Sequence, residues 1–353
     1  MSSDLIPELI CKRVFLGAGR PLLPSAVEYI VTQLHAHSAA GEALSEWTFV
    51  LPTSQSALRF NELLSTRVAE GNRPASPLKT LTSGDLAETL YQPERPIAIE
   101  FEQTLAWTRV LRDCDPDTLR PLLPVLPEND SVASWLELAG TLRRLTADLA
   151  THEVTFDDVL AESETDAERQ RWQLLQKLYL SYLSQLKSAS LADPFEQRRR
   201  AIKRGTVRAS GPLALIGTSD LNPSIARLIQ AVDKDVLAFI AASEKDHADF
   251  DWIGRLRTDA FLGQQLPLSD EQIVSANDVS DQALAVGELV HLMSSQHGID
   301  EISVGVTDPS QLVPVEMQLE AMGHPTYRHV GWTVNTTAVG KLIALVAEFV
   351  TRR

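Results

Sequence analysis

Cysteine is scarce in this sequence, and so are the features of membrane and secreted proteins. Its 353 residues include two cysteines, Cys11 and Cys114, which lie far apart and form no Cys-x-x-Cys pair. This usage is typical of a reducing compartment and disfavours a thiolate metal site. No apolar run reaches the roughly 18 residues of a membrane span, and the first fifteen residues lack the pattern of a secretory signal. We therefore expect a cytoplasmic protein with no membrane partner and no bound metal.

Basic residues are also in short supply. Lysine and arginine total 32 against 47 acidic residues, which gives a formal net charge of −15. Nucleic-acid binding by overall charge is therefore not expected, because phosphate neutralisation needs clustered lysine and arginine. A local basic groove remains compatible with this balance, and an acidic exterior suits a subunit of a larger assembly. With 44% hydrophobic and 22% charged residues, the chain can form a packed core in two domains or one large one.

Strand-like and helix-like segments alternate near the start of the chain and again from residue 211. Apolar runs at 13–17, 47–53 and 78–82 are each followed by helical apolar spacing, in the second case from Ser54 onwards. Strand–helix repetition of this kind predicts a parallel, doubly wound sheet. Residues 97–205 are instead rich in Leu, Ala, Glu and Arg and carry the apolar stripes of helices, which predicts a helical insertion.

The first strand-like run leads into a glycine-rich turn and then a helical segment expected from Pro24. A phosphate-binding loop cradles phosphates with backbone amides, and needs a lysine for charge and a Ser/Thr hydroxyl for magnesium. Here Gly17 and Gly19 are present, but Arg20 and Pro21 stand near the place of the Lys-Ser/Thr pair. Proline also lacks an amide donor. We predict a retained turn, with a residual anion site at the helix start as the alternative.

A second segment, LALIGTSDLNPSIARLIQAV from Leu213, resembles the Walker B region of UvrD/RecB-type superfamily 1 helicases. In those proteins the strand ends in Asp-Glu-x-Gln-Asp, followed by a Leu-Asn-Pro-like stretch and a helix. Asp220 and the Leu-Asn-Pro after it match this tail. Ile216 and Gly217, however, hold the places of the magnesium-binding Asp and the water-activating Glu, and Ser219 replaces the Gln. Hydrolysis needs both carboxylates, so this degenerate Walker B region implies an inactive site.

Other segments follow in helicase order. VLPTSQSALRFNELL, from Val50, looks like the segment in which a Thr-Ser region contacts single-stranded DNA. AASEKDHADFDWIGR holds the place of a motif whose Gly-Asp and Gln are absent, and residues 301–331 look like the opening of a second motor domain. In motif order, nearly the whole chain resembles the N-terminal inactivated helicase-like region of the AddB/RexB family of ATP-dependent helicase–nuclease components, a functional cousin of RecC.

The resemblance implies a fold and a set of domain boundaries. The expected fold is α/β, with a RecA-like, P-loop-type parallel sheet, an α-helical insertion and the start of a second α/β domain. The first part of the RecA-like domain is expected over residues 1–96, the insertion over 97–208, the rest of that domain over 209–280, and the second domain over 281–353. Residues 301–307 are expected to form a strand of this second domain.

The resemblance also implies a function. This segment would be a non-catalytic scaffold that holds or scans a single- or double-stranded DNA end together with an AddA-like helicase–nuclease, in double-strand break repair and recombination. It would bind neither ATP nor magnesium. The family's nuclease domain lies further downstream, so the longer protein would be an exonuclease subunit. Two alternatives remain: a protein-interaction module that does not bind DNA, and an ATPase in which Arg20 replaces the missing lysine.

Two groups of residues are candidates for DNA contact. Thr53, Ser54 and Gln55 follow a predicted strand at the edge where such folds bind ligands, and either DNA contact or helix capping would account for them. The densest basic run is expected to form either a patch that contacts phosphates or a solvated linker that leaves the helical insertion. It contains Arg198, Arg199, Arg200, Lys203 and Arg204.

Several other residues could suggest a metal or DNA site, but we expect them to have structural roles. Asp220 is expected to cap the helix after it, and His247 and His291 lack partners at metal spacing. Four aromatic residues on helical stripes are expected to pack in a core rather than stack on bases. They are Trp135, Trp172, Tyr179 and Tyr182.

Overall fold

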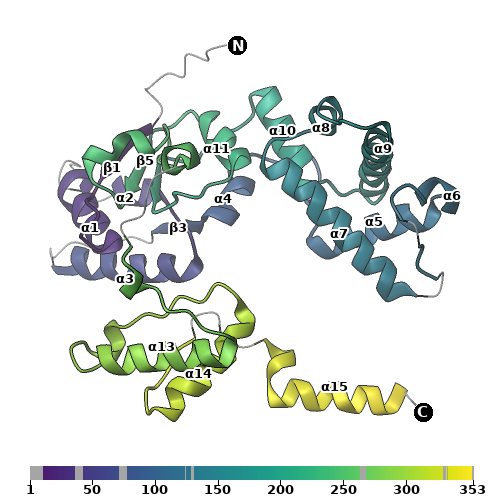
Figure 1. Ribbon diagram of the computed structural model, residues 1–353. Coiled ribbons are helices and arrows are strands. Elements are labelled where there is room, and N and C mark those ends of the chain that lie inside the picture. The colour runs from purple at the N-terminus through teal and green to yellow at the C-terminus, as the bar shows by residue number, and fades with distance from the viewer. Residues whose placement is uncertain are drawn as a thin grey trace. The chain divides into compact units, whose positions relative to one another are not determined.

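The computed structural model describes residues 11–35, 43–70, 78–123, 125–128, 131–262, 268–328, 331 and 333–351. The chain forms two compact units, Met1–Gln264 and Gln265–Arg353. The first unit contains a sheet with its flanking helices and a helical insertion (Figure 1).

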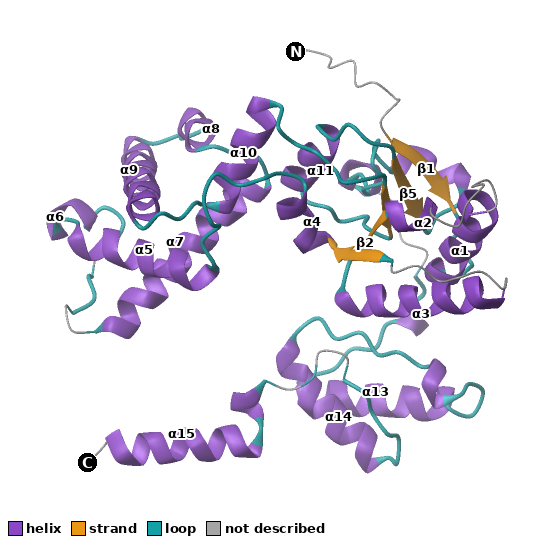
Figure 2. Ribbon diagram, turned by 180° about the vertical axis from the view of Figure 1, so that it is seen from behind, coloured by secondary structure: helices purple, strands orange, loops and turns teal. Residues whose placement is uncertain are grey.

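A five-stranded sheet in the order β1-β5-β4-β2-β3 organises the first unit, and every neighbouring pair of strands is parallel. Figure 2 shows strands β1, β5 and β2 of this sheet in orange. The strands are β1 (Cys11–Phe15), β2 (Thr48–Leu51), β3 (Lys79–Thr82), β4 (Leu213–Ile216) and β5 (Val236–Ile240). The predicted α/β class with a parallel sheet is confirmed, and the sheet is consistent with a RecA-like fold. Strand β5, late in the sequence, lies between β1 and β4.

Helices cover both faces of this sheet. One face carries α4 (Ser83–Thr89), α10 (Pro194–Arg204) and α11 (Pro223–Gln230), whose apolar side chains form the first core. The other carries α1 (Leu22–Tyr29), continued by the π-helical η1 (Ile30–His35), with α2 (Ala43–Glu46) and α3 (Ser54–Glu70). The unit also contains η2 (Glu244–Asp249) and α12 (Thr258–Phe261).

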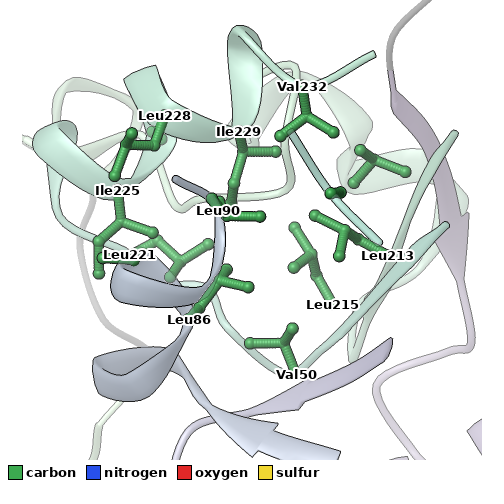
Figure 3. Close-up of a cluster of buried hydrophobic side chains, with 14 of the residues drawn as sticks. Val50, Leu86, Leu90, Leu213, Leu215, Leu221, Ile225, Leu228, Ile229 and Val232 are labelled. Carbon is green, nitrogen blue, oxygen red and sulfur yellow. The ribbon is translucent and has the colours of Figure 1, made fainter. Parts of the chain in front are cut away.

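The central strands are apolar throughout because successive side chains enter opposite cores. In β4, Leu213 and Leu215 join the first core, while Ala214 and Ile216 join the second. Figure 3 shows Leu215 close to side chains of α4 and α11 in the first core. Each such leucine or isoleucine contributes about 1.5–3 kcal/mol when fully buried, so these short strands are held mainly by the helices that cover them.

The insertion has a core of its own. It comprises α5 (Glu100–Asp113), α6 (Pro116–Leu119), α7 (Val132–Thr151), α8 (Phe156–Ala161) and α9 (Asp166–Ser188). Trp107 stacks on Tyr182 with ring centroids 4.7 Å apart. Trp135 and Tyr182 are buried, and Trp172 and Tyr179 are partly buried against the same core. The prediction that these aromatic residues pack in a core is therefore confirmed.

The described residues of the second unit form helices and turns. They are η3 (Asp270–Gln272), α13 (Val279–Met293), η4 (Ile299–Glu301), η5 (Pro309–Gln311), α14 (Leu312–Ala321), η6 (Val334–Thr336) and α15 (Ala338–Thr351). The strand predicted over 301–307 is not formed, because no neighbouring strand among the described residues satisfies its backbone groups. A small core joins α13 to α14 through Ala283, Val290, Val315 and Leu319.

Candidate nucleotide and nucleic-acid site

The loops that follow β1, β2, β4 and β5 leave the carboxyl ends of parallel strands at one edge of the sheet. Parallel α/β proteins bind ligands at this edge. The structure therefore places the residues of the predicted nucleotide loop, Gly17, Gly19 and Arg20, on the same edge as Gly217, Ser219 and Asp220, which follow β4. The DNA-contact candidates after β2 lie on this edge as well.

The glycine-rich loop is bound to the end of β5. The amide of Leu16 donates to the carbonyl of Ile240 at 2.9 Å, and the amide of Gly17 donates to that of Ala242 at 2.9 Å. An N–H group already bonded to a carbonyl is not free to cradle a phosphate. Gly17 has φ +90, a conformation that glycine adopts readily, and Gly19 and Arg20 are exposed. The loop therefore behaves as a turn.

Leucine occupies the space beside the end of β4. Helix α1 begins at Leu22, two residues before the predicted start, and Pro21 precedes it without a side-chain cap. A Cβ atom added to Gly217 would lie 2.6 Å from Cδ2 of Leu22 and 4.0 Å from Cγ of Pro52. The Leu22 side chain therefore packs directly on the Gly217 backbone. The early start is compatible with Pro24, because first-turn amides have no intrahelical partner.

This arrangement supplies no carboxylate where hydrolysis would need one. Ile216 is fully buried in the core shared with α1, and Gly217 has no side chain. Ser219 is exposed, and its carbonyl accepts a hydrogen bond from the amide of Leu256 at 3.0 Å. Nucleotide hydrolysis requires carboxylate oxygens on magnesium and near the attacking water. The end of β4 therefore offers neither group.

Asp220 is exposed and does not cap the following helix, so that prediction is wrong. The cap of α11 is Asn222, whose Oδ1 accepts from the amide of Ile225 at 2.9 Å. Asn222 directly precedes Pro223 at the first helical position, which is where an N-cap belongs.

The residues after β2 are exposed, and one of them caps α3. Oγ1 of Thr53 accepts from the amide of Ser56 at 3.1 Å, and the amide of Thr53 donates to Oγ of Ser56 at 3.0 Å. Ser54 is the first helical residue, and Gln55 follows it on the exposed surface. The capping interpretation holds for Thr53. Ser54 and Gln55 keep their side chains at the ligand edge of the sheet.

The basic run lies on helix α10 rather than in a solvated linker, so the linker interpretation is wrong. The side chain of Asp193 caps the helix by accepting from the amide of Glu196 at 2.9 Å, and Gly205, with φ +62, ends it. Ala201 faces the first core of the sheet. The run is helical because its apolar positions pack on this core, which the density of charges in the sequence concealed.

Glutamates hold most of these arginines. Nη2 of Arg198 donates to Oε1 of Glu88 at 2.7 Å, and its guanidinium lies 4.8 Å from the ring centroid of Phe195. Only 11% of the Arg198 side chain is exposed. The remaining ion pairs of the helix are Arg199 and Arg200 with Glu196, and Arg200 and Arg204 with Glu94. Any phosphate bound here would have to compete with these carboxylates.

A buried polar pair joins α9 to α10. The hydroxyl of Tyr182 donates to Oδ2 of Asp193 at 2.9 Å. Burial raises the pKa of Asp193 above its ordinary value, against the lowering effect of the bonds it accepts from Glu196 and Tyr182. Burial also raises the pKa of Tyr182, with the nearby Asp193 carboxylate as a further cause. Sequence reasoning did not identify this pair, since neither residue belongs to a motif.

Metal-ligating side chains do not gather in the described part of the chain: no three His, Cys, Asp or Glu residues there are placed to hold an ion. Nδ1 of His291 lies 3.1 Å from Nε2 of His324, a partner that sequence reasoning missed. The carbonyl of His247 accepts from Arg13 at 3.0 Å. Burial raises the pKa of the Cys11 thiol to about 12.

Together these features define an α/β protein with a five-stranded parallel sheet that is consistent with a RecA-like fold, in which β4 ends in Ile216 and is followed by Gly217. No protein-family model matches the sequence, and no curated protein is significantly similar to it. Across the described helices, none combines the length and apolar composition needed to cross a bilayer.

Proposed function

We propose that this chain is a non-hydrolytic, helicase-like scaffold that holds or scans a DNA end during double-strand break processing. An AddA-like helicase–nuclease subunit would drive translocation along the DNA. The observation that carries the proposal is the packing of Leu22 on Gly217 at the ligand edge of a RecA-like sheet. The parallel strand order is consistent with a RecA-like fold, β4 ends without an acidic residue, and the motif order in the sequence resembles the inactivated region of AddB/RexB proteins.

The proposed DNA path follows the loop after β2. Ser54 and Gln55 are exposed at the start of α3, where the positive end of the helix dipole favours a phosphate. On α10, Lys203 is exposed and has no ion pair among the described residues, so it is the cation of that helix most available to DNA. Single-stranded DNA would then be bound mainly through its backbone, with affinity that falls as salt rises.

Fluorescence anisotropy with a labelled single strand and with a blunt hairpin end tests this proposal. The S54E/Q55E variant places two negative charges on the path, and we expect it to weaken binding at least tenfold at low salt. Ser184→Glu on the exposed side of α9 is the control and should leave the affinity unchanged. Equal affinity in both variants would contradict a path along this edge.

ATP hydrolysis must be measured alongside, with and without single-stranded DNA. We expect no turnover, because no carboxylate stands at the end of β4. A rate above about one per second, in the usual range for enzymes, would support the ATPase alternative with Arg20 in place of the lysine.

One observation favours a protein-interaction module instead. The arginines of α10 are paired with Glu88, Glu94 and Glu196, and the whole chain carries a net charge of −15. Such a module would show no salt-dependent DNA binding at all. If neither the single strand nor the hairpin end binds, the protein-interaction module would replace the scaffold proposal.

A further inference from the structure

A separate hollow of about 330 Å³ lies in the first unit. The end of α7 and the segment leading to α8 form one side, and α10 and α11 form the others. Its volume is at the lower end of the range for pockets that bind small molecules. The hollow joins the insertion to the body of the sheet, because α7 contacts both α10 and α11.

Basic side chains dominate the polar lining of this hollow. Arg199 and Lys203 come from α10, Arg227 comes from α11, and Glu153 supplies a carboxylate. The three cations face Glu153 and also Glu196, which pairs with Arg199 from outside the lining, so one positive charge remains in excess within a chain whose net charge is −15. Such a site favours an anion, and guanidinium groups suit phosphate oxygens in particular.

Two of these cations have hydrogen-bonding capacity that the described residues do not use. Nε of Arg199 is buried and has no acceptor there. Lys203 is exposed and forms no ion pair with any residue in the described ranges. Because Nε is out of reach of solvent, a phosphate would bind the other nitrogens of this guanidinium, of which Nη2 lies 3.6 Å from Oε2 of Glu196.

Glu153 and the apolar lining restrict what can enter. Glu153 has φ +60 at the end of α7, where glycine is preferred, and its carboxylate accepts from Nη1 of Arg227 at 3.0 Å. Val154 and Ile202 also line the hollow. A ligand that displaces part of the Arg227–Glu153 pair and covers this apolar surface needs an anionic group attached to a less polar body.

We infer that this hollow binds a small phosphate ester of about nucleotide size. The phosphate would lie among Arg199, Lys203 and Arg227, and the organic body would lie against Val154 and Ile202. The source is either a free nucleotide or the phosphorylated end of a nucleic-acid strand, since both present the same chemistry. Lys203 is common to this hollow and to the proposed DNA surface of α10, but the inference rests on the lining of the hollow and not on the loop after β2.

Calorimetric titration of the whole chain with deoxyadenosine monophosphate tests the site. Lys203→Ala should weaken binding about tenfold by removing one charge-assisted hydrogen bond. Glu153→Gln should strengthen it about threefold, because it removes the only carboxylate among the lining residues. Lys187→Ala, which removes an exposed lysine of α9 outside the hollow, is the matched control and should have no effect.

Two further arms identify the source of the phosphate. A single-stranded oligonucleotide with a 5′-phosphate is compared with the same strand lacking it. Binding of the mononucleotide alone assigns a free nucleotide, and a gain from the 5′-phosphate that Lys203→Ala abolishes assigns a strand end. The inference is overturned if no phosphate ester binds at millimolar concentration, or if Lys187→Ala weakens binding as much as Lys203→Ala. The S54E/Q55E variant should leave mononucleotide binding intact, which separates this test from that of the scaffold.

Discussion

Gly217, directly after β4, is a position at which the structure has no room for a side chain. Its φ of +66 suits glycine, and the nearby Leu22 side chain leaves no room for a Cβ atom. A carboxylate cannot be restored at this position without first moving Leu22. The absence of a side chain at Gly217 and the packing of Leu22 against this backbone position therefore depend on each other.

Substitution of Gly217 should be unusually costly. Gly217→Ala adds a left-handed strain of about 1–2 kcal/mol and an overpacking cost of about 1–3 kcal/mol. Gly205 is the matched control, since it has φ +62 and no atom within 4 Å of its added Cβ, so Gly205→Ala should cost only the strain. Urea unfolding measures both. Equal losses, or no recovery when Leu22→Ala is added to Gly217→Ala, would show that Leu22 does not crowd this position.

Asp193 should make stability depend on pH. Its native pKa is raised above the ordinary value of 3.8, so the native state holds the proton more tightly than the unfolded state. This contribution to stability is present below pH 3.8 and is lost as the pH rises through the native pKa. Asp193→Asn keeps a capping oxygen but cannot ionise, so its stability relative to wild type should be more favourable at pH 7 than at pH 4.

Urea unfolding at both pH values tests this expectation. Asp193→Ala is the comparison, because it removes the cap of α10 and should cost about 1 kcal/mol or more at either pH. A smaller cost for Asp193→Asn at pH 4 than at pH 7 would contradict the assigned direction.

At the scale of elements, two helices end in the same unusual way. Glu153 after α7 and Ser190 after α9 both have φ +60. In each case the next amide donates to a carbonyl near the helix end at 2.9 Å, from Val154 to Leu149 and from Leu191 to Leu186. Glycine is the usual residue at this position of the motif. Side chains other than glycine therefore carry a backbone cost at both ends.

Glycine substitutions at Glu153 and Ser190 separate the cost of backbone strain from the contribution of the ion pair. Ser190→Gly should stabilise the chain by about 0.5–1 kcal/mol through relief of the left-handed conformation. Glu153→Gly gains the same relief but loses the pair with Arg227, a partly exposed interaction worth up to about 1 kcal/mol. Chemical denaturation of both variants gives the difference. A larger gain for Glu153→Gly than for Ser190→Gly would rule out a stabilising ion pair.

At the scale of the whole molecule, the two units differ in the size of their cores. The first unit contains two cores on the sheet and a third in the insertion, whereas the described core of the second unit contains four buried residues. Helix α15 adds little to it, since Leu342, Ile343 and Phe349 are all more than half exposed. The first unit therefore holds most of the apolar burial that stabilises the described chain.

We expect residues 1–264 to fold without residues 265–353. Removal of the second unit should leave the main thermal transition within about 2–4 °C of its original midpoint, the shift that a 1 kcal/mol change produces in a domain of this size. Circular dichroism melting of the shortened and full chains provides the comparison. A truncated chain that is unfolded, or that melts well below the full chain, would show that the units depend on each other for stability.

Local patterns were sufficient for much of the fold. The apolar runs of β2, β4 and β5 and the start of α3 at Ser54 follow from side-chain periodicity, which depends only on near neighbours in sequence. The same kind of pattern failed at 301–307, where alternation is present but no partner strand lies beside it among the described residues. The sequence also shows directly that Arg20 and Pro21 follow Gly19 and that Ile216 and Gly217 are not acidic.

Tertiary structure alone decided how these elements combine. Strand β5 lies between β1 and β4, and Arg198 and Arg204 pair with Glu88 and Glu94, each 110 residues away. The contact of Leu22 with Gly217 and the basic hollow lined by α7, α10 and α11 likewise join residues that are far apart in sequence. Sequence by itself determined most strands and helices of the first unit and which residue types its motif-like segments lack. The neighbours of each group depend on the path of the whole chain, because burial and pairing join residues that periodicity cannot relate.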